Sequence, residues 1–233
     1  MSELIHRDHR SRMKARFAAQ GLDGLNDHEA LELLLYFAVP RVDTNPIAHR
    51  LLDTFGSLHG VIDASPEALK RVQGIGENAA TLLVLLREMM RRYAMDKAEK
   101  DFKSASLTTT EKIGRYLTPF FVGVNEERMV ALATDIKGKV LGVEEISRGT
   151  TRATDVNIRR LAEFAIRYQA ASVILAHNHP GGLALPSHDD MQTTRRIRET
   201  LGSLSIGLRD HIIIAGDDFV SMSDSGMLKY VDG

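Results

Sequence analysis

Two histidines in the motif His177-Asn178-His179-Pro180 have the spacing that most directly suggests chemistry in this chain. They follow a short apolar run, residues 172–176, that is expected to form a buried strand. Because strand side chains alternate with a period of two, both imidazoles project to the same side and can reach one ion. Pro180 has no N–H for the strand ladder and Gly181-Gly182 permit a sharp turn, so the chain is expected to leave the strand here.

A serine and an aspartate follow this turn at a spacing that suits the start of a helix. Ser187 and Asp190 lie three residues apart, which places both on one face of the first helical turn. A carboxylate oxygen of Asp190 would complete a set of two histidines and one aspartate. Three protein ligands with a fourth position left to water are typical of catalytic zinc, where the pKa of the bound water drops toward ~7. The spacing therefore predicts a metal centre with hydroxide available at neutral pH.

Each half of this motif also has an interpretation without a metal. Ser-x-x-Asp before an amphipathic helix is typical of an N-terminal cap, with Ser187 as the N-cap and Asp190 favourable to the helix dipole. His-x-His is often just a polar pair at a strand end. The metal hypothesis rests on the combination, because neither alternative needs the two pairs to be joined by a Pro-Gly-Gly turn. His188 and Asp189 face away from the other side chains and are expected to be solvated.

Together these residues resemble the JAMM (MPN+) metalloprotease motif in the version found in bacterial RadC-family proteins. Two further segments carry the resemblance: residues 144–150, Glu-Glu-Ile-Ser-Arg-Gly-Thr, are similar to the family's glutamate-bearing strand before a Gly-Thr turn, and residues 210–214, Asp-His-Ile-Ile-Ile, are similar to its late Asp-His strand. The resemblance covers residues 107–228, and the helical half is similar to the family's N-terminal region. It implies a Zn²⁺ ion held by His177, His179 and Asp190.

The resemblance also implies roles for residues beside the ion. The activity would be hydrolysis of peptide or isopeptide bonds in a protein or peptide substrate, with Ser187 supporting the oxyanion and an upstream glutamate acting as general acid and base. Glu144 and Glu145 point to opposite faces of a strand, so only one can face the metal. Glu144, five residues before Gly149, matches the family spacing better and is the predicted base. Glu145 would be solvated or structural, and ordinary surface placement is the alternative for either glutamate.

Hydrophobic periodicity divides the chain into the elements that must position this motif. Helical spacing of apolar residues from Asp27 to Met95 predicts an all-helical domain over residues 1–98, followed by a charged linker over residues 99–106. Residues 107–233 then alternate strands, at 129–133, 140–143, 172–176, 211–215 and 219–221, with helices at 155–169 and 191–201. With the resemblance, this predicts a JAMM/MPN-type, cytidine-deaminase-like α/β domain with a mixed sheet flanked by helices. His211 is expected to be a buried or strand-end histidine rather than a fourth ligand.

The helical half carries a second motif, Gly74-Ile75-Gly76, between two expected helices. It resembles the hairpin of a helix-hairpin-helix module, in which glycines allow close approach and N–H groups at the next helix start hold a phosphate oxygen. This would suit a contact with DNA that does not depend on sequence, and a degenerate copy spans residues 30–52. Gly-x-Gly also serves plain helical corners, and Glu77 stands where a phosphate site would prefer a cation. The DNA contact therefore stays open.

Composition narrows the class of protein. The chain has no cysteine, which excludes disulfides, thiolate zinc sites and nucleobase deaminases that need a Pro-Cys-x-x-Cys ligand pair. A formal net charge of −1 confines any contact with nucleic acid to a local surface. No segment approaches the ~18 apolar residues of a membrane span and the start has no secretory h-region, so a cytoplasmic protein without membrane contact is expected.

Two functional hypotheses follow. The first is a zinc-dependent metallopeptidase of the JAMM type in the RadC family. The second is a DNA-associated accessory protein of the repair or recombination type, with a structural or vestigial metal. Imidazole and carboxylate ligands suit several divalent metals, so residue types alone leave the physiological ion open.

Overall fold

The computed structural model describes residues 2–102, 106–149 and 157–232. The chain forms two compact units, Met1–Met90 and Arg91–Gly233. The division falls inside one long helix, α6 (Glu77–Phe102), whose two parts belong to different units. Within the described residues, no helix combines the length and the apolar content that crossing a membrane requires.

The first unit is helical, as the periodicity predicts. Its elements are α1 (Ser2–Gln20), the 3₁₀ turn η1 (Leu22–Gly24), α2 (Asp27–Leu35), α3 (Asn45–Phe55), α4 (Leu58–Asp63), α5 (Pro66–Lys70) and the start of α6. The short helices begin at capping serines, since the hydroxyls of Ser57 and Ser65 accept the N–H groups of Gly60 and Ala68. The core consists of apolar side chains from α2 to α6, among them Leu31, Leu35, Leu51, Leu69 and Leu83.

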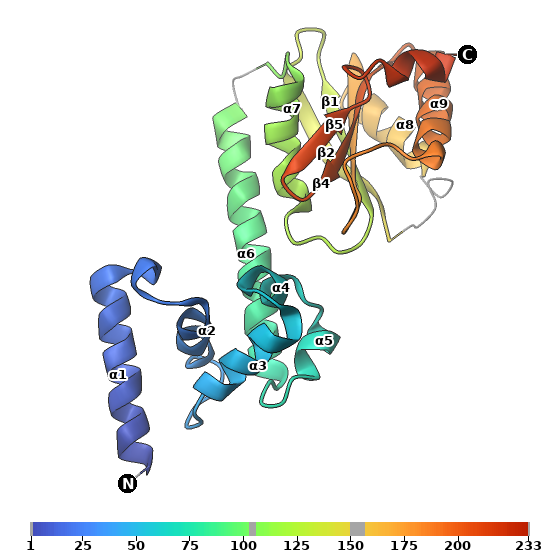
Figure 1. The fold of residues 1–233 in the computed structure, drawn as a ribbon. Coiled ribbons are helices and arrows are strands. Elements are labelled where there is room, and N and C mark those ends of the chain that lie inside the picture. The colour runs from blue at the N-terminus through green and yellow to red at the C-terminus, as the bar shows by residue number, and fades with distance from the viewer. Residues whose placement is uncertain (1, 103–105, 150–156, 233) are drawn as a thin grey trace. The chain divides into compact units, whose positions relative to one another are not determined.

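The second unit is built on a five-stranded mixed sheet (Figure 1). In chain order it contains α7 (Thr110–Leu117), η2 (Thr118–Phe121), β1 (Arg128–Thr134), β2 (Val140–Arg148), α8 (Ile158–Arg167), β3 (Ser172–Asn178), α9 (His188–Ser203), β4 (Gly207–Ala215), β5 (Asp218–Ser221) and η4 (Met227–Asp232). The strand order is β2-β1-β3-β4-β5. Strands β3 and β4 are parallel with α9 as their crossover, and the other neighbours are antiparallel. The predicted mixed sheet flanked by helices is confirmed.

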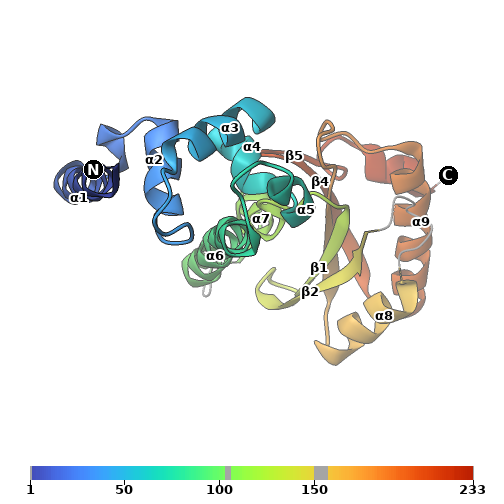
Figure 2. The ribbon, with the colours of Figure 1, turned by 90° about the horizontal axis from the view of Figure 1, so that it is seen from below.

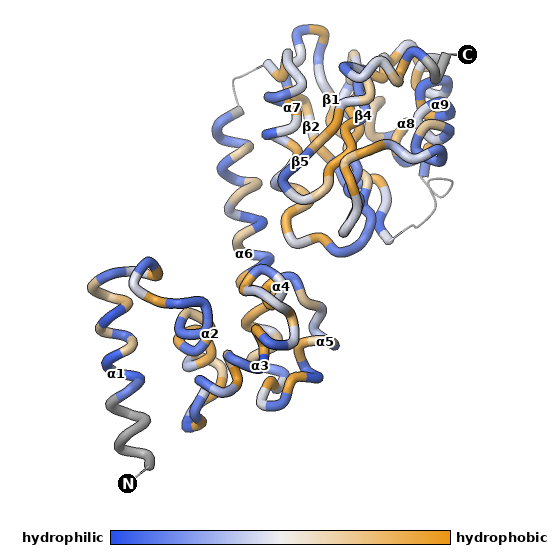
Figure 3. Tube along the Cα trace, viewed as in Figure 1, coloured by the Kyte–Doolittle hydropathy of each residue, from blue (hydrophilic) through white to orange (hydrophobic). Residues whose placement is uncertain are grey.

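Helices cover both faces of this sheet (Figure 2). On one face, α8 and α9 pack on a core that includes Ala131 and Leu175, and on the other, α7 packs on a core that includes Val130 and Ile174. Figure 3 shows the hydrophobic residues gathered along the strands, while α9 is largely hydrophilic on its outer side. Because side chains alternate along β3, His177 shares the α8–α9 face with Leu175.

The expected linker differs from the structure at its start. Helix α6 continues through residues 99–102, which the charged composition had assigned to the linker. The reason is tertiary packing: Ala98 is buried in the α7-side core of the second unit, so the last turns of the helix are held there. Residues 103–105 of the expected linker, and residues 155 and 156 of the helix expected over 155–169, lie outside the described residues.

Candidate metal centre

The two histidines are held at the end of β3 by the neighbouring strand. His177 is the last residue but one of β3 and is only 5% exposed. The backbone N–H of His179 donates to the carbonyl of Ile214 in β4 at 2.8 Å, which keeps the chain beside the sheet one residue beyond β3. Gly181 then adopts a left-handed φ of 68°, which glycine tolerates, and the chain turns away. The turn predicted after Pro180 is therefore present.

Asp190 reaches the histidines from the first turn of α9. Ser187 is the N-cap: its Oγ accepts the N–H of Asp190 at 3.1 Å, and the carboxylate of Asp190 accepts the backbone N–H of Ser187 at 2.7 Å. This reciprocal pair is a capping box. The cap and the metal hypothesis were alternatives from sequence, but the structure makes them compatible. The cap orients the carboxylate so that it faces the strand end.

Three potential ligand atoms converge at this point. The Nε2 atom of His177 lies 3.0 Å from Oδ1 of Asp190 and 2.9 Å from Nε2 of His179, and the latter atom lies 3.3 Å from Oδ2 of Asp190. A tetrahedral zinc site with bonds of about 2.0–2.1 Å has ligand atoms about 3.3 Å apart. The donor set and its spacing therefore fit a divalent metal ion. His177, His179 and Asp190 are the one such group found within the described part of the chain.

Hydrogen bonds and charge prepare these groups for a cation. Burial disfavours ionisation of Asp190, but its hydrogen bonds with His177 and His179 outweigh burial and hold the pKa of the carboxyl far below its usual range. The hydrogen bond to Asp190 raises the pKa of His179. The Nδ1 atom of His179 lies 3.2 Å from the carbonyl oxygen of Leu183, which requires a proton on Nδ1 and leaves Nε2 as the ligand atom.

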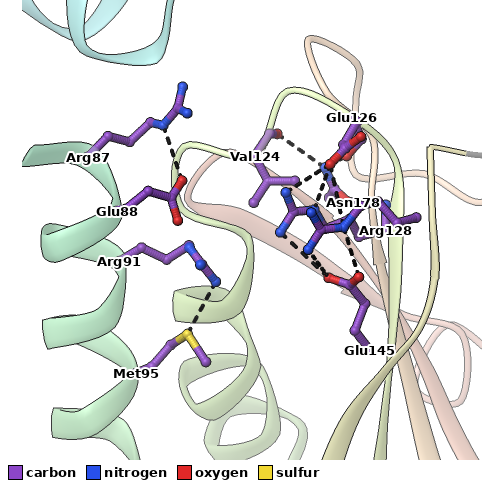
Figure 4. Close-up of polar contacts among 10 residues, drawn as sticks. Arg87, Glu88, Arg91, Met95, Val124, Glu126, Arg128, Glu145 and Asn178 are labelled. Carbon is purple, nitrogen blue, oxygen red and sulfur yellow. Dashed lines mark hydrogen bonds and ion pairs between the residues drawn. The ribbon is translucent and has the colours of Figure 1, made fainter. Parts of the chain in front are cut away.

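The two glutamates singled out in the sequence lie away from these three residues. Glu144 pairs with Ala131 across β1 and β2 and so shares the sheet face of His177, but its carboxylate bonds Arg167 at 2.7 Å. Glu145 faces the other side of the sheet, where Arg148 binds it at 2.9 Å. Figure 4 shows Glu145 beside Arg128. Glu144 thus lies on the sheet face of His177, but two residues along the sheet and one strand beyond it.

Figure 4 also shows what occupies the opposite side of the strand end. The side chain of Asn178 accepts the backbone N–H of Arg128 at 2.8 Å and donates to the carbonyl of Glu126 at 3.0 Å. These bonds join the end of β3 to the start of β1. The residue between the two histidines therefore anchors them to the sheet, a role that follows from alternation along the strand.

Glu127 is a further acidic residue near the centre, and the sequence analysis did not single it out. Met129 pairs directly with His177 between β1 and β3. Glu127 lies two residues earlier, one residue before β1, so alternation would place it on the same face, toward His179. Its charge contributes to the raised pKa of His179. The period of two would place Glu127 with Met129 from sequence, but only the strand pairing places both beside the histidines.

The hydroxyl of Ser187 is already engaged. Its Oγ donates to Oδ2 of Asp190 at 2.6 Å while accepting the N–H of the same residue. A hydroxyl has one hydrogen to donate. Ser187 would therefore support an oxyanion only by giving up its bond to Asp190, a step that becomes easier when Asp190 shares its charge with a cation.

In the helical unit, the Gly74-Ile75-Gly76 segment borders an open groove with a volume of about 280 Å³. The groove is lined by residues of both expected hairpins, namely Ala38, Val39, Pro40, Gly74, Gly76, Glu77, Asn78 and Ala79. Gly74 has a φ of 97°, and a side chain there would collide with Ile47, so this position needs glycine. Gly76 precedes α6 and a Cβ atom there would meet nothing within 4 Å.

Comparison with known proteins gives consistent matches. A family model described as RadC-like JAB domain matches residues 107–227. A UPF0758 protein of Fusobacterium nucleatum is 34% identical over 98% of this chain and 100% of its own length. UPF0758 proteins of Ruegeria pomeroyi and of a Polaromonas species are 34% and 33% identical, covering 95% and 94% of this chain and 98% and 96% of their own lengths.

Proposed function

The chain belongs to the RadC family, and from that premise we propose that it is a zinc-dependent hydrolase that cleaves peptide or isopeptide bonds in a protein or peptide substrate. The convergence of His177, His179 and Asp190, with Nε2 and carboxylate oxygens at tetrahedral spacing, carries the proposal. When bound, zinc supplies Lewis acidity and lowers the pKa of a coordinated water. A structural zinc would more commonly have four protein ligands, so this three-residue set favours catalysis.

General base catalysis needs a carboxylate that faces the ligands. Glu144 is the candidate from the sequence pattern, whereas Glu127 is the candidate from strand pairing, and we favour Glu127. It directly precedes β1, which pairs with the end of β3, and its charge acts on His179. Glu144 is already engaged by Arg167. Glu127 would accept a proton from the attacking water and pass it to the leaving amine, while Ser187 would hold the oxyanion after releasing Asp190.

Hydrolysis tests the proposal directly. Full-length protein loaded with one equivalent of Zn²⁺ should cleave members of a fluorogenic peptide library or of a panel of isopeptide-linked lysine substrates. Cleavage should stop with a chelator and return with added Zn²⁺, because the three ligands are useless for this chemistry without the ion. A protein that binds Zn²⁺ stoichiometrically yet cleaves no member of either set would contradict the proposal.

The groove of the helical unit supports a second candidate function, a DNA-associated accessory role. Gly76 leaves the backbone open just before α6, and the Ala80 N–H donates to the carbonyl of Gly76 as the first turn begins. The N–H groups of such a turn suit a phosphate oxygen. Against this, Glu77 lines the groove, and Lys70 partly offsets its charge at 3.1 Å. Duplex binding would be weak and strongly dependent on salt.

Gly76→Asp should therefore weaken duplex binding and reduce the slope of log affinity against log salt by about one, the contribution of one phosphate contact. Aspartate is a favourable residue before a helix and meets no atom here, so the thermal midpoint should not fall. Fluorescence anisotropy with a labelled duplex over a salt series measures both quantities. Gly202→Asp adds the same charge at another open position, and the metal-site variant Asp190→Ala should bind DNA normally. Equal affinity of Gly76→Asp and wild type would exclude this hairpin as the contact.

A further inference from the structure

A third histidine lies behind the candidate metal centre. His211, in β4, is fully buried, and both of its ring nitrogens have partners. Its Nε2 lies 2.8 Å from Nδ1 of His177, and its Nδ1 lies 2.6 Å from Oγ1 of Thr194 in α9. His211 is therefore not part of the ligand cluster, as the sequence indicated. It contacts Nδ1 of His177, whereas Nδ1 of His179 faces the backbone carbonyl of Leu183.

The hydrogen bonds of this group have one consistent direction. Nε2 of His177 is the atom that faces Asp190 and His179, so a neutral His177 that ligates through it carries its proton on Nδ1. That proton is donated to Nε2 of His211, which must then be the acceptor. The proton of His211 is consequently on Nδ1 and is donated to Thr194, whose own hydroxyl proton is donated to the backbone carbonyl of Asp190 at 2.6 Å.

The alternative direction conflicts with the metal centre. If Thr194 donated to Nδ1 of His211, His211 would carry its proton on Nε2 and donate to Nδ1 of His177. His177 would then hold its own proton on Nε2, where the cation must bind. The bond from Thr194 to the Asp190 carbonyl uses the one hydroxyl proton available and prevents this arrangement; the sulfur of Met222 is much farther from Oγ1, at 3.8 Å.

We propose that His211 and Thr194 are positioning residues that hold His177 in the Nδ1–H tautomer and thereby set the metal affinity of the centre. The relay is the chain of hydrogen bonds from His177 on β3 through His211 on β4 to Thr194 on α9, and it ends on the backbone carbonyl of another candidate ligand, Asp190. It thus ties together the two elements that must meet for the site to exist. Outer partners of this kind typically contribute about 10–100-fold in metal affinity. The inference rests on the proposed metal site.

Thr194→Val tests the relay with little change of shape. It removes the acceptor for His211 and the donor for Asp190, so Zn²⁺ affinity, measured by competition with a chromophoric chelator, should fall about 10–100-fold. Thr194→Ser keeps the hydroxyl and should restore wild-type affinity. Thr200→Val is the matched control, because Thr200 makes the same bond to a carbonyl four residues earlier in α9 and has no histidine partner in the described residues. Its affinity should equal that of wild type.

The tautomer of His177 can be measured directly, and a purely structural effect of the substitution would not change it. Long-range ¹H–¹⁵N spectra of the full chain should show His177 protonated on Nδ1 in wild type and Thr194→Ser, and a mixture of tautomers in metal-free Thr194→Val. If Thr194→Val fails to fold, His211→Gln and His211→Leu are compared instead. Glutamine retains an acceptor for the Nδ1 proton of His177, and leucine does not. His211→Gln should bind Zn²⁺ more tightly than His211→Leu.

Zn²⁺ binding by wild type and by Thr194→Val distinguishes an error in the proposed metal site from an error in the proposed relay. A wild type that binds no Zn²⁺ would overturn the metal site and the relay together. A wild type that binds Zn²⁺, with folded Thr194→Val of equal affinity and an unchanged His177 tautomer, would overturn the relay and leave the metal site intact. Equal losses in Thr194→Val and Thr200→Val would also overturn it, because they would assign the effect to helix stability.

Discussion

Asp190→Asn is expected to abolish stoichiometric Zn²⁺ binding. The loss of Zn²⁺ affinity should exceed the factor of about 10–100 that follows from removing a residue that only contacts a ligand. The substitution keeps the size of the side chain but removes the negative charge that faces both imidazoles at 3.0 and 3.3 Å. Metal content after dialysis measures the loss. Thermal unfolding gives an independent measure: Zn²⁺ at 100 times its dissociation constant should stabilise wild type by about 2.7 kcal/mol and should not stabilise the variant.

The neighbouring residue provides the control. Asp189→Asn makes the same chemical change one position earlier in α9, on an exposed residue outside the candidate ligand group, so it should bind Zn²⁺ as wild type does. His188→Ala serves equally for the histidines, because His188 is exposed and bonds Gln192 instead. Full Zn²⁺ occupancy of Asp190→Asn, or equal losses in Asp190→Asn and Asp189→Asn, would be incompatible with the proposed centre.

Glu127→Gln is expected to lower the rate of hydrolysis by about 10²–10⁴-fold, the usual contribution of a general base. The amide keeps the shape of the side chain but cannot accept the proton of the attacking water. Zn²⁺ content should stay at the wild-type level, because Glu127 is outside the group of three candidate ligands. Single-turnover cleavage of the best substrate from the library, measured with metal-loaded protein, gives the rate.

Glu144→Gln decides between the two glutamates. It breaks the ion pair with Arg167, a partly exposed contact of the kind that contributes about 0.2–1 kcal/mol to stability, and it should leave the rate nearly unchanged. Glu126→Gln, next to Glu127 but paired with Arg128, should also retain activity. A large rate loss in Glu144→Gln together with an active Glu127→Gln would instead support the assignment made from sequence spacing.

Much of the fold was predictable because it depends on local patterns. Helical periodicity predicts the all-α first unit, and alternation with buried apolar runs predicts the strands of the second. The boundaries were less accurate where packing prevails over composition. Residues 99–101 are charged, yet the helix continues through residue 102 because Ala98 is buried against the sheet face that α7 also covers. Composition describes how a segment interacts with water and does not reveal which core its neighbours enter.

The convergence of the three candidate metal ligands was predictable for a similar reason. His177 and His179 are two residues apart on a strand, and Asp190 is the third residue of a helix capped by Ser187. Each pair is oriented by the period of its own element, and a short turn joins the two pairs. The sequence allows Ser187 and Asp190 to form a cap or to take part in a metal site. In the structure they form the cap while the carboxylate of Asp190 also faces the histidines, because its two oxygens can serve the helix start and the strand end at once.

The sequence by itself thus determined the elements and the three residues that converge, since those follow from spacing within about a dozen positions. The tertiary structure alone decided which distant residues stand beside them. Glu127 reaches the centre through the pairing of β1 with β3, and His211 reaches it through the pairing of β3 with β4. Strand register depends on how whole faces are buried together, and no local period encodes which residue of one strand lies opposite a given residue of another.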